Sequence, residues 1–398
     1  MTYDFTTFVD RVGKDSIAAN IIPFENAQVK EGFTSIPMWV ADMSYPTAPP
    51  VLEAIKKRLD FPSFGYFSLP DEYYERIIAW QQRQGWAKEL RKEHIGYENG
   101  VLGGVSSAIQ ALTCPGDEIL IHSPTYVGFT EALKHIGRPI VHSALKRDEA
   151  GVWRMDYEDM DRKLKERHIH MAILCSPHNP TGRVWERWEL EKAMEVYAAN
   201  DCLVISDEIW SDIIMPGYKH IPTQSVSEDA KMRAIAFYSP SKTFSLAGLI
   251  GSYHIIYDST LRHRVRRQGE MSHYNACNVL SMHGLLGAYS PEGREWADQM
   301  CRAIEENFRF ACAFIEENFP GVSVCRPQGT YMLFLDCGGW CRERNMSIQA
   351  LLRKGVEVGV IWQNGEAFAW PQAIRMNLAL PKAKLIEAME RLKEYVFV

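Results

Sequence analysis

The stretch AIAFYSPSKTF, residues 234–244, joins an apolar run to a lysine that stands among hydroxyl-bearing residues. The run from Ala234 to Tyr238 contains no charged residue, which is typical of a buried strand. Lys242 is therefore expected where a buried strand ends, although an ammonium group is strongly hydrated and costly to bury. We infer that Lys242 has a function at this strand end.

Similar apolar runs recur between residues 100 and 260 and alternate with helical patterns. The runs span 118–122, 171–175, 203–206 and 253–256, and amphipathic stretches lie at 156–167 and 186–199. Strands that are apolar on both faces and alternate with helices predict an α/β fold, with a mostly parallel sheet covered on both sides. In such sheets, ligands bind beyond the carboxyl ends of the strands.

The pattern changes after residue 290. A long helical stretch from 294 to about 318 is followed by the apolar segments GVSVCRP (321–327) and TYMLFLD (330–336) and by a helical C-terminus. The sequence therefore predicts a large domain over residues 46–290 and a smaller α/β domain over residues 291–398. We expect residues 1–45 to form an N-terminal segment that packs on the small domain.

Composition and charge argue against several classes of protein. The chain has 44 basic and 50 acidic residues and a net charge of −6, so no broad basic surface is expected to bind nucleic acid. The basic run RHRVRR (262–267) is interpreted as a solvated helix face or a subunit contact. We expect neither a signal peptide nor a membrane span. The nine cysteines are scattered without a C-x-x-C pair, which predicts reduced thiols, no metal site and a cytoplasmic protein.

Four polar features fall at predicted strand ends or strand–helix turns. GVLGGVSSAIQAL (100–112) places glycines before a helix, whose N-terminus can bind an anion. SPHNPTG (176–182) carries Asn179, and VISDEIW (204–210) places Asp207 at the end of an apolar strand. The fourth feature is Lys242 with Ser239 and Ser241. Each feature taken singly also has a structural explanation, such as a tight turn or an ion pair.

Taken together, the four features fit one cofactor. A lysine forms an imine with an aldehyde, and a buried carboxylate keeps a pyridine nitrogen protonated, so that the ring accepts electrons. Hydroxyl groups and a glycine-rich helix start can hold a phosphate, and an asparagine can bond a phenolic oxygen. The sequence therefore predicts a pyridoxal 5′-phosphate (PLP) site in which Lys242 is the Schiff-base lysine.

The order of Asn179, Asp207, Lys242 and Arg375 resembles that of the fold type I PLP-dependent enzymes of the aspartate aminotransferase superfamily. Within it, IPMWVADMSYPTAPP (36–50), FGYFS (64–68), SPTYVGF (123–129) and TYMLFLD are most similar to the MalY/PatB-type C–S β-lyases. The resemblance implies a large domain with a mostly parallel seven-stranded sheet flanked by helices, and a smaller α/β C-terminal domain.

The resemblance also implies contacts to the cofactor. Tyr126 would stack on the pyridine ring and contribute to catalysis. The phosphate would be held by backbone groups and hydroxyls of Leu102, Gly103, Gly104, Ser239 and Ser241. Many members carry Tyr or His three residues after the aspartate, whereas this chain has Trp210, whose indole N–H can donate but not accept a hydrogen bond.

For the substrate, the resemblance implies that Arg375 binds the α-carboxylate as a bidentate fork, with Ala41 and Asn179 beside it. It further implies a homodimer, in which Tyr66 reaches the cofactor phosphate of the neighbouring subunit. Without the resemblance, Arg375 would be interpreted as a surface strand residue.

The implied reaction is an α,β-elimination on L-cystathionine or related cysteine S-conjugates, yielding a thiol, pyruvate and ammonia. Lys242 would remove the Cα proton as a general base. Two alternatives stay open. One is an aminotransferase that uses the same lysine and releases a keto acid. The other is a second role as a protein that binds a transcription activator, which some MalY-type proteins have.

Overall fold

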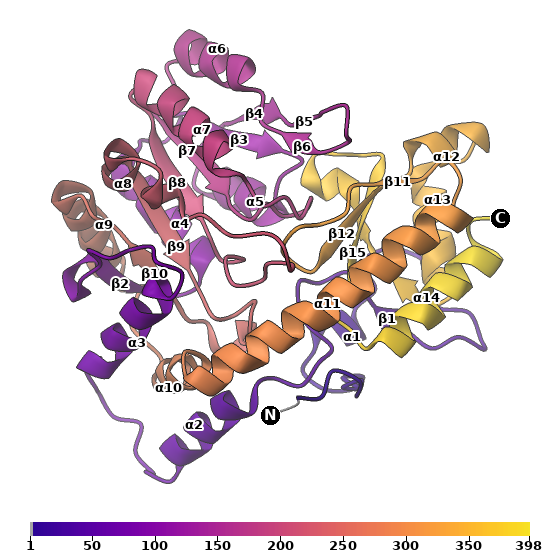
Figure 1. The fold of residues 1–398 in the computed structure, drawn as a ribbon, viewed down its shortest axis with the longest axis horizontal. Coiled ribbons are helices and arrows are strands. Elements are labelled where there is room, and N and C mark those ends of the chain that lie inside the picture. Colours follow the sequence, from indigo (N-terminus) through magenta and orange to yellow (C-terminus); the bar gives the residue numbers. More distant parts are fainter. Residues whose placement is uncertain (1–2) are drawn as a thin grey trace.

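The computed structural model describes residues 3–398 and contains a seven-stranded sheet with helices packed around it (Figure 1). From one edge to the other, its strands are β2 (Ile95–Glu98), β10 (Ser252–Ile255), β9 (Ala234–Tyr238), β8 (Leu203–Asp207), β7 (Met171–Cys175), β3 (Ile119–Ser123) and β4 (Ile140–Ala144). Strand β10 is antiparallel to both of its neighbours, and the other neighbouring pairs are parallel. The predicted mostly parallel sheet is confirmed.

Helices cover both faces of this sheet because successive strand residues point to opposite sides. One face carries α4 (Val101–Leu112), α5 (Val127–His135) and α9 (Ser259–Ser272), and the other carries α6 (Tyr157–Arg167), α7 (Arg187–Ala199) and α8 (Glu228–Arg233). Ile173 of β7 packs in the first layer, whereas its neighbours Ala172 and Leu174 pack in the second. The strands are therefore apolar on both sides, as the sequence pattern predicts.

In the large domain, element ends agree with the predicted ranges to within about one residue, and caps explain two of the shifts. Strands β7 and β9 match their predicted ranges. Helix α6 begins after Asp156, because the Asp156 side chain accepts a hydrogen bond from the backbone N–H of Asp159. Helix α7 begins after Glu186, which forms a capping box with Glu189.

The C-terminal part begins with the long helix α11 (Pro291–Asn318), three residues before the predicted start. Ser290 caps it by accepting the N–H of Gly293, and a proline fits the first turn of a helix. A four-stranded antiparallel sheet follows, in the order β11 (Ser323–Val324), β12 (Met332–Asp336), β15 (Ala373–Asn377) and β14 (Gln363–Asn364). Helices α12 (Gly338–Glu343), α13 (Ile348–Glu357) and α14 (Lys382–Tyr395) complete this part.

Further helices and short strands lie outside the two large sheets. They are α1 (Ile17–Asn20), β1 (Ile36–Pro37), α2 (Pro49–Leu59), α3 (Asp71–Gln82), α10 (Val279–Ala288), β13 (Val360–Ile361) and the hairpin of β5 (Lys146–Arg147) with β6 (Trp153–Arg154). Strand β1 pairs in parallel with β13, so the N-terminal segment is bound to the C-terminal part. Helix α11 crosses the molecule from α10 and α2 to α14 (Figure 1).

The pairing of β1 with β13 agrees with an N-terminal segment that packs on the C-terminal part. The division at residues 45 and 290 stays a proposal, and residues 1 and 2 of the N-terminal segment lie outside the described part. Within residues 3–398, no helix has the length and apolarity needed to cross a membrane.

Candidate active site

The predicted motifs meet at the edge of the large sheet where β7, β8 and β9 end. A cavity of about 210 Å³ lies there. It is lined by Ala41, Gly100, Val101, Leu102, Tyr126, Cys175, Asn179, Asp207, Ile209, Trp210, Ser241, Lys242, Ala247, Ile250 and Gly251. Because parallel strands end at the same edge, residues far apart in sequence share one cavity.

Lys242 lies in the turn after β9 and is partly buried. Its Nζ donates a hydrogen bond to the carbonyl oxygen of Ala41 at 3.1 Å. Burial lowers the pKa of Lys242 to about 8, and the nearby Arg375 guanidinium acts in the same direction, whereas Asp42 and Asp207 oppose the shift. Near neutral pH most of this lysine is therefore still an ammonium, and about a tenth of it is an uncharged amine.

The two serines of the Lys242 turn have different positions. The Ser239 hydroxyl donates to the carbonyl of Gly251 at 2.6 Å and accepts the backbone N–H of Ser241 at 3.0 Å. Ser239 is not among the cavity-lining residues, whereas Ser241 is. The Ser239 hydroxyl thus fixes the turn that carries the lysine, and Ser241 is placed to meet a ligand.

Asp207 is the last residue of β8 and is buried beneath the cavity. Its Oδ1 accepts the backbone N–H of Ile209 at 3.1 Å. Burial raises the pKa of Asp207 to about 7. No ion pair with Asp207 occurs in the described part of the chain, so a cationic group that enters the cavity would favour the carboxylate form.

The N-terminus of α4 lies at the cavity and offers backbone N–H groups of the kind that can bind an anion. Helix geometry leaves the N–H groups from Val101 to Gly103 without helical partners, and Leu102 lines the cavity. The predicted backbone donor at Gly104 is not free, because its N–H already donates to the carbonyl of Gly100 at 3.1 Å. A Cβ at Gly104 would stand 2.5 Å from the Phe237 ring, so close packing on the sheet accounts for this glycine.

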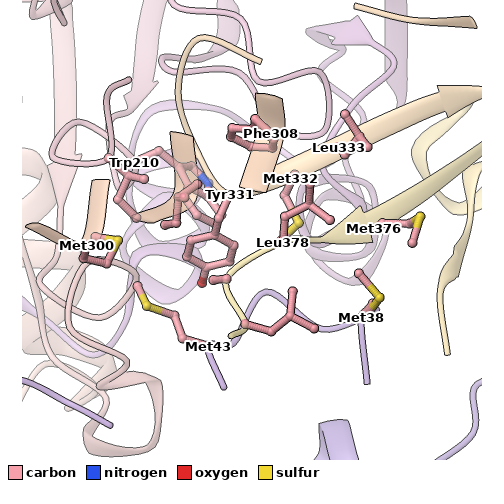
Figure 2. Close-up of a cluster of buried hydrophobic side chains, with 14 of the residues drawn as sticks. Met38, Met43, Trp210, Met300, Phe308, Tyr331, Met332, Leu333, Met376 and Leu378 are labelled. Carbon is pink, nitrogen blue, oxygen red and sulfur yellow. The ribbon is translucent and has the colours of Figure 1, made fainter. Parts of the chain in front are cut away.

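Two aromatic residues form walls of the cavity. Tyr126 precedes α5, and a Cβ at Gly128 would stand 2.5 Å from its ring, so the glycine leaves room for that ring. Trp210 is buried and meets Tyr331 edge to face, with ring centroids 4.7 Å apart (Figure 2). The Nζ of Lys242 lies 5.8 Å from the Trp210 ring centroid. The Trp210 indole N–H has no hydrogen-bond partner among residues 3–398.

Arg375 lies in β15 and is buried, contrary to the surface position that its local sequence suggests. Its Nη1 donates to Oδ1 of Asn179 at 3.0 Å, and its Nη2 donates to the Trp39 carbonyl at 2.8 Å and to Oε1 of Gln363. Its Nε is buried and has no hydrogen-bond partner among residues 3–398. Burial lowers the pKa of Arg375 to about 10, so the group is still a cation at neutral pH. A buried guanidinium with only neutral acceptors suits an incoming carboxylate.

Residues 38–44, hereafter the strap, connect Arg375 with Lys242. The backbone N–H of Asn377 donates to the Met38 carbonyl, and its side-chain amide donates to the carbonyls of Val40 and Asp42. Met38 and Met43 belong to the buried apolar cluster around Tyr331 (Figure 2). Asn377 is a site residue that was not predicted from the sequence. Its position two residues after Arg375 in a strand is a signal that the two side chains share a face.

Tyr66 is not part of the cavity within one chain. It lies in the connection between α2 and α3, which extends at the edge of the molecule (Figure 1), and its side chain is fully exposed. The other missed residues, among them Gly100, Cys175 and Ile209, line the cavity with backbone or apolar groups, for which the sequence carries no chemical signal.

The chain is similar in sequence to known enzymes over most of its length. The sequence model described as aminotransferase class I and II matches residues 36–392. Cystathionine β-lyase PatB of Bacillus subtilis is 34% identical over 364 residues, which cover 90% of this chain and 92% of the relative. Aspartate aminotransferase of Sulfurisphaera tokodaii is 25% identical over 99% of this chain and 98% of its own.

A solved structure is similar over nearly the full length. The crystal structure of cystalysin from Treponema denticola, which contains a pyridoxal 5′-phosphate cofactor, superimposes with a TM-score of 0.91. The two chains are 30% identical, and the match covers 99% of this chain and 98% of cystalysin.

Proposed function

The chain belongs to the aminotransferase class I and II family and has the fold type I architecture, and from this premise we propose that it is a PLP-dependent C–S β-lyase. Its substrates are L-cystathionine or related cysteine S-conjugates, and its products are a thiol, pyruvate and ammonia. The observation that carries the proposal is the likeness to cystathionine β-lyase PatB over nine-tenths of the chain, together with Lys242 and Asp207 at one cavity.

The residues at the cavity fit the cofactor pyridoxal 5′-phosphate. Lys242 offers an amine of lowered pKa to an aldehyde, and the carboxyl of Asp207 lacks the cation that a protonated pyridine nitrogen would supply. The start of α4 and Ser241 offer donors to a phosphate, and Tyr126 offers a ring face. When bound, the cofactor supplies an acceptor for the electrons released at Cα of the substrate.

Lys242 is proposed as the base that takes the Cα proton. Its uncharged form accepts a proton, and the Ala41 carbonyl, 3.1 Å away, can hold the resulting ammonium group in place. Loss of the Cα proton and departure of the thiolate from Cβ, followed by hydrolysis, account for pyruvate, ammonia and the thiol. Asp207 contributes by holding a proton on the cofactor nitrogen.

Arg375 is proposed as the group that binds the α-carboxylate of the substrate. Among residues 3–398, its side-chain hydrogen-bond acceptors, Asn179 and Gln363, are uncharged amides, so no carboxylate pairs with the guanidinium there. Binding the carboxylate there orients Cα toward the cavity that contains Lys242.

An aminotransferase is the second candidate, because a relative 25% identical over nearly the whole chain is an aspartate aminotransferase. A product assay with L-cystathionine as the only substrate separates the two. A lyase releases pyruvate and a thiol continuously, whereas an aminotransferase stops after one half-reaction until a keto acid is added. The absence of continuous pyruvate release would contradict the lyase proposal.

We also propose that the working unit is a homodimer with Tyr66 contributed by the partner chain. The support is the exposed apolar character of its segment: Phe61, Phe64 and Phe67 are 63%, 61% and 41% exposed. If each site combines Lys242 of one chain with Tyr66 of the other, mixing Tyr66→Phe with Lys242→Ala protomers creates heterodimers with one intact site. Activity should then exceed that of either parent, and a fully active monomer would contradict the proposal.

A further inference from the structure

Arg375 is already bound by a side-chain oxygen of its own chain. Gln363 of β14 stands directly opposite Arg375 of β15 in antiparallel register, so both side chains lie on the same face of the small sheet. Oε1 of Gln363 accepts a hydrogen bond from Nη2 of Arg375. The backbone pairing therefore fixes Gln363 at the guanidinium.

The hydrogen-bond donors of Arg375 show what an incoming carboxylate must displace. Both Nη2 hydrogens are used, one by the Trp39 carbonyl and one by Gln363, while the adjacent Nε is buried and unpartnered. Nε and Nη2 form the side edge of a guanidinium, to which a carboxylate binds through two parallel hydrogen bonds. A carboxylate that uses this edge must replace one of the two oxygens on Nη2.

Of these two oxygens, that of Gln363 can move more freely. The Trp39 carbonyl belongs to the strap, whose backbone is held by Asn377 and Lys242. Gln363 is only partly buried, and a rotation about its side-chain bonds releases Oε1 without moving the backbone. An amide oxygen is also a weaker acceptor for a cation than a carboxylate is.

We propose that Gln363 is a specificity-determining residue, whose neutral oxygen occupies Arg375 until the α-carboxylate of an amino-acid substrate displaces it. The inference rests on the proposed function, in which Arg375 binds that carboxylate. An amine without a carboxylate leaves Gln363 in place and gains nothing from Arg375. A neutral residue at position 363 therefore favours α-amino acids over amines.

Three variants of the holoenzyme test the inference. Gln363→Glu places a permanent carboxylate at Arg375, and Gln363→Leu removes the oxygen at similar volume. Asn364→Asp is the matched control: it makes the same charge change at the next residue, whose side chain bonds to Glu366 instead. Dissociation constants for L-alanine and for ethylamine, which lacks the carboxylate, are measured from the cofactor absorbance. Cofactor content and thermal unfolding establish that each variant is folded.

Gln363→Glu should weaken L-alanine binding about 10- to 100-fold while ethylamine binding changes by about twofold or less. Gln363→Leu should bind L-alanine as tightly as the unmodified protein or more tightly, and Asn364→Asp should change neither constant beyond about twofold. Unchanged L-alanine binding in Gln363→Glu would overturn the inference. So would a Gln363→Leu variant that loses as much affinity as Gln363→Glu, because Gln363 would then be a required contact.

The test of Gln363 and the test of the lyase proposal can be told apart by their results. If the unmodified protein responds to L-alanine but releases no pyruvate from L-cystathionine, only the lyase assignment fails, and the role of Gln363 is still decided by the variants. If the unmodified protein binds L-alanine no better than ethylamine, Arg375 does not bind the carboxylate, and the inference about Gln363 fails with that part of the proposed function.

Discussion

Asp207→Asn should stabilise the protein without cofactor and at the same time impair the enzyme. In the folded chain, burial raises the pKa of Asp207 from 3.8 to about 7. Folding therefore favours the protonated carboxyl. As the pH rises from about 4 to about 7, Asp207 ionises more readily in the unfolded chain, and the free energy of unfolding falls. The pKa of Asp207 differs between the folded and unfolded chain by about three units, which corresponds to about 4 kcal/mol. This free energy is the cost of keeping the carboxylate buried above pH 7.

Asparagine has nearly the same shape, keeps an oxygen for the N–H of Ile209 and does not ionise. Relative to the unmodified apoprotein, the variant should therefore gain about 2 kcal/mol in free energy of unfolding at pH 5 and about 4 kcal/mol at pH 8. The cost of burying the asparagine amide does not depend on pH. It therefore cancels when the stability gain at pH 5 is subtracted from the gain at pH 8. Urea unfolding of both apoproteins at pH 5 and pH 8 measures that difference.

The same substitution should lower turnover of the holoenzyme about 100-fold or more, because an amide cannot stabilise a protonated pyridine nitrogen as a carboxylate does. A stability gain that is equal at pH 5 and pH 8 would refute the assignment of Asp207 as a buried ionising group. Unchanged turnover would refute its role at the cofactor.

Two further predictions concern Lys242 and Arg375. Borohydride reduction of the holoenzyme, followed by peptide mass mapping, should locate a pyridoxyl adduct on Lys242, and an adduct on a different lysine would contradict the assignment. Arg375→Lys keeps the charge but loses the fork, so kcat/KM should fall about 10- to 100-fold while cofactor affinity is retained. Loss of cofactor affinity in that variant would place Arg375 in the cofactor site or in the fold.

The sequence alone was sufficient for the five inner strands of the large sheet and for the main polar groups of the site, whereas the edge strands β2 and β4 were not among the predicted runs. Strands β7 and β9 are uninterrupted apolar runs, and such runs between amphipathic helices identify buried parallel strands from local information. Asn179, Asp207 and Lys242 could be singled out because each follows such a run, where a polar or charged group is costly unless it has a partner. Their shared position follows from the rule that parallel strands end at one edge.

Arg375 shows the limit of local information. Its segment reads as an ordinary strand, and only the resemblance to a known family marked the residue. Its burial depends on the strap and on Gln363, which pack against it from other parts of the chain.

Only the tertiary structure decided which partner each polar group has. Lys242 bonds to the carbonyl of Ala41, 201 residues away in sequence, and the Ser239 hydroxyl donates to the backbone carbonyl of Gly251. Gln363 faces Arg375 because of the register of two short antiparallel strands. Hydrophobic periodicity shows that a residue lies in a buried strand, but a hydrogen bond depends on positions set by the packing of the whole chain, and no local pattern contains them.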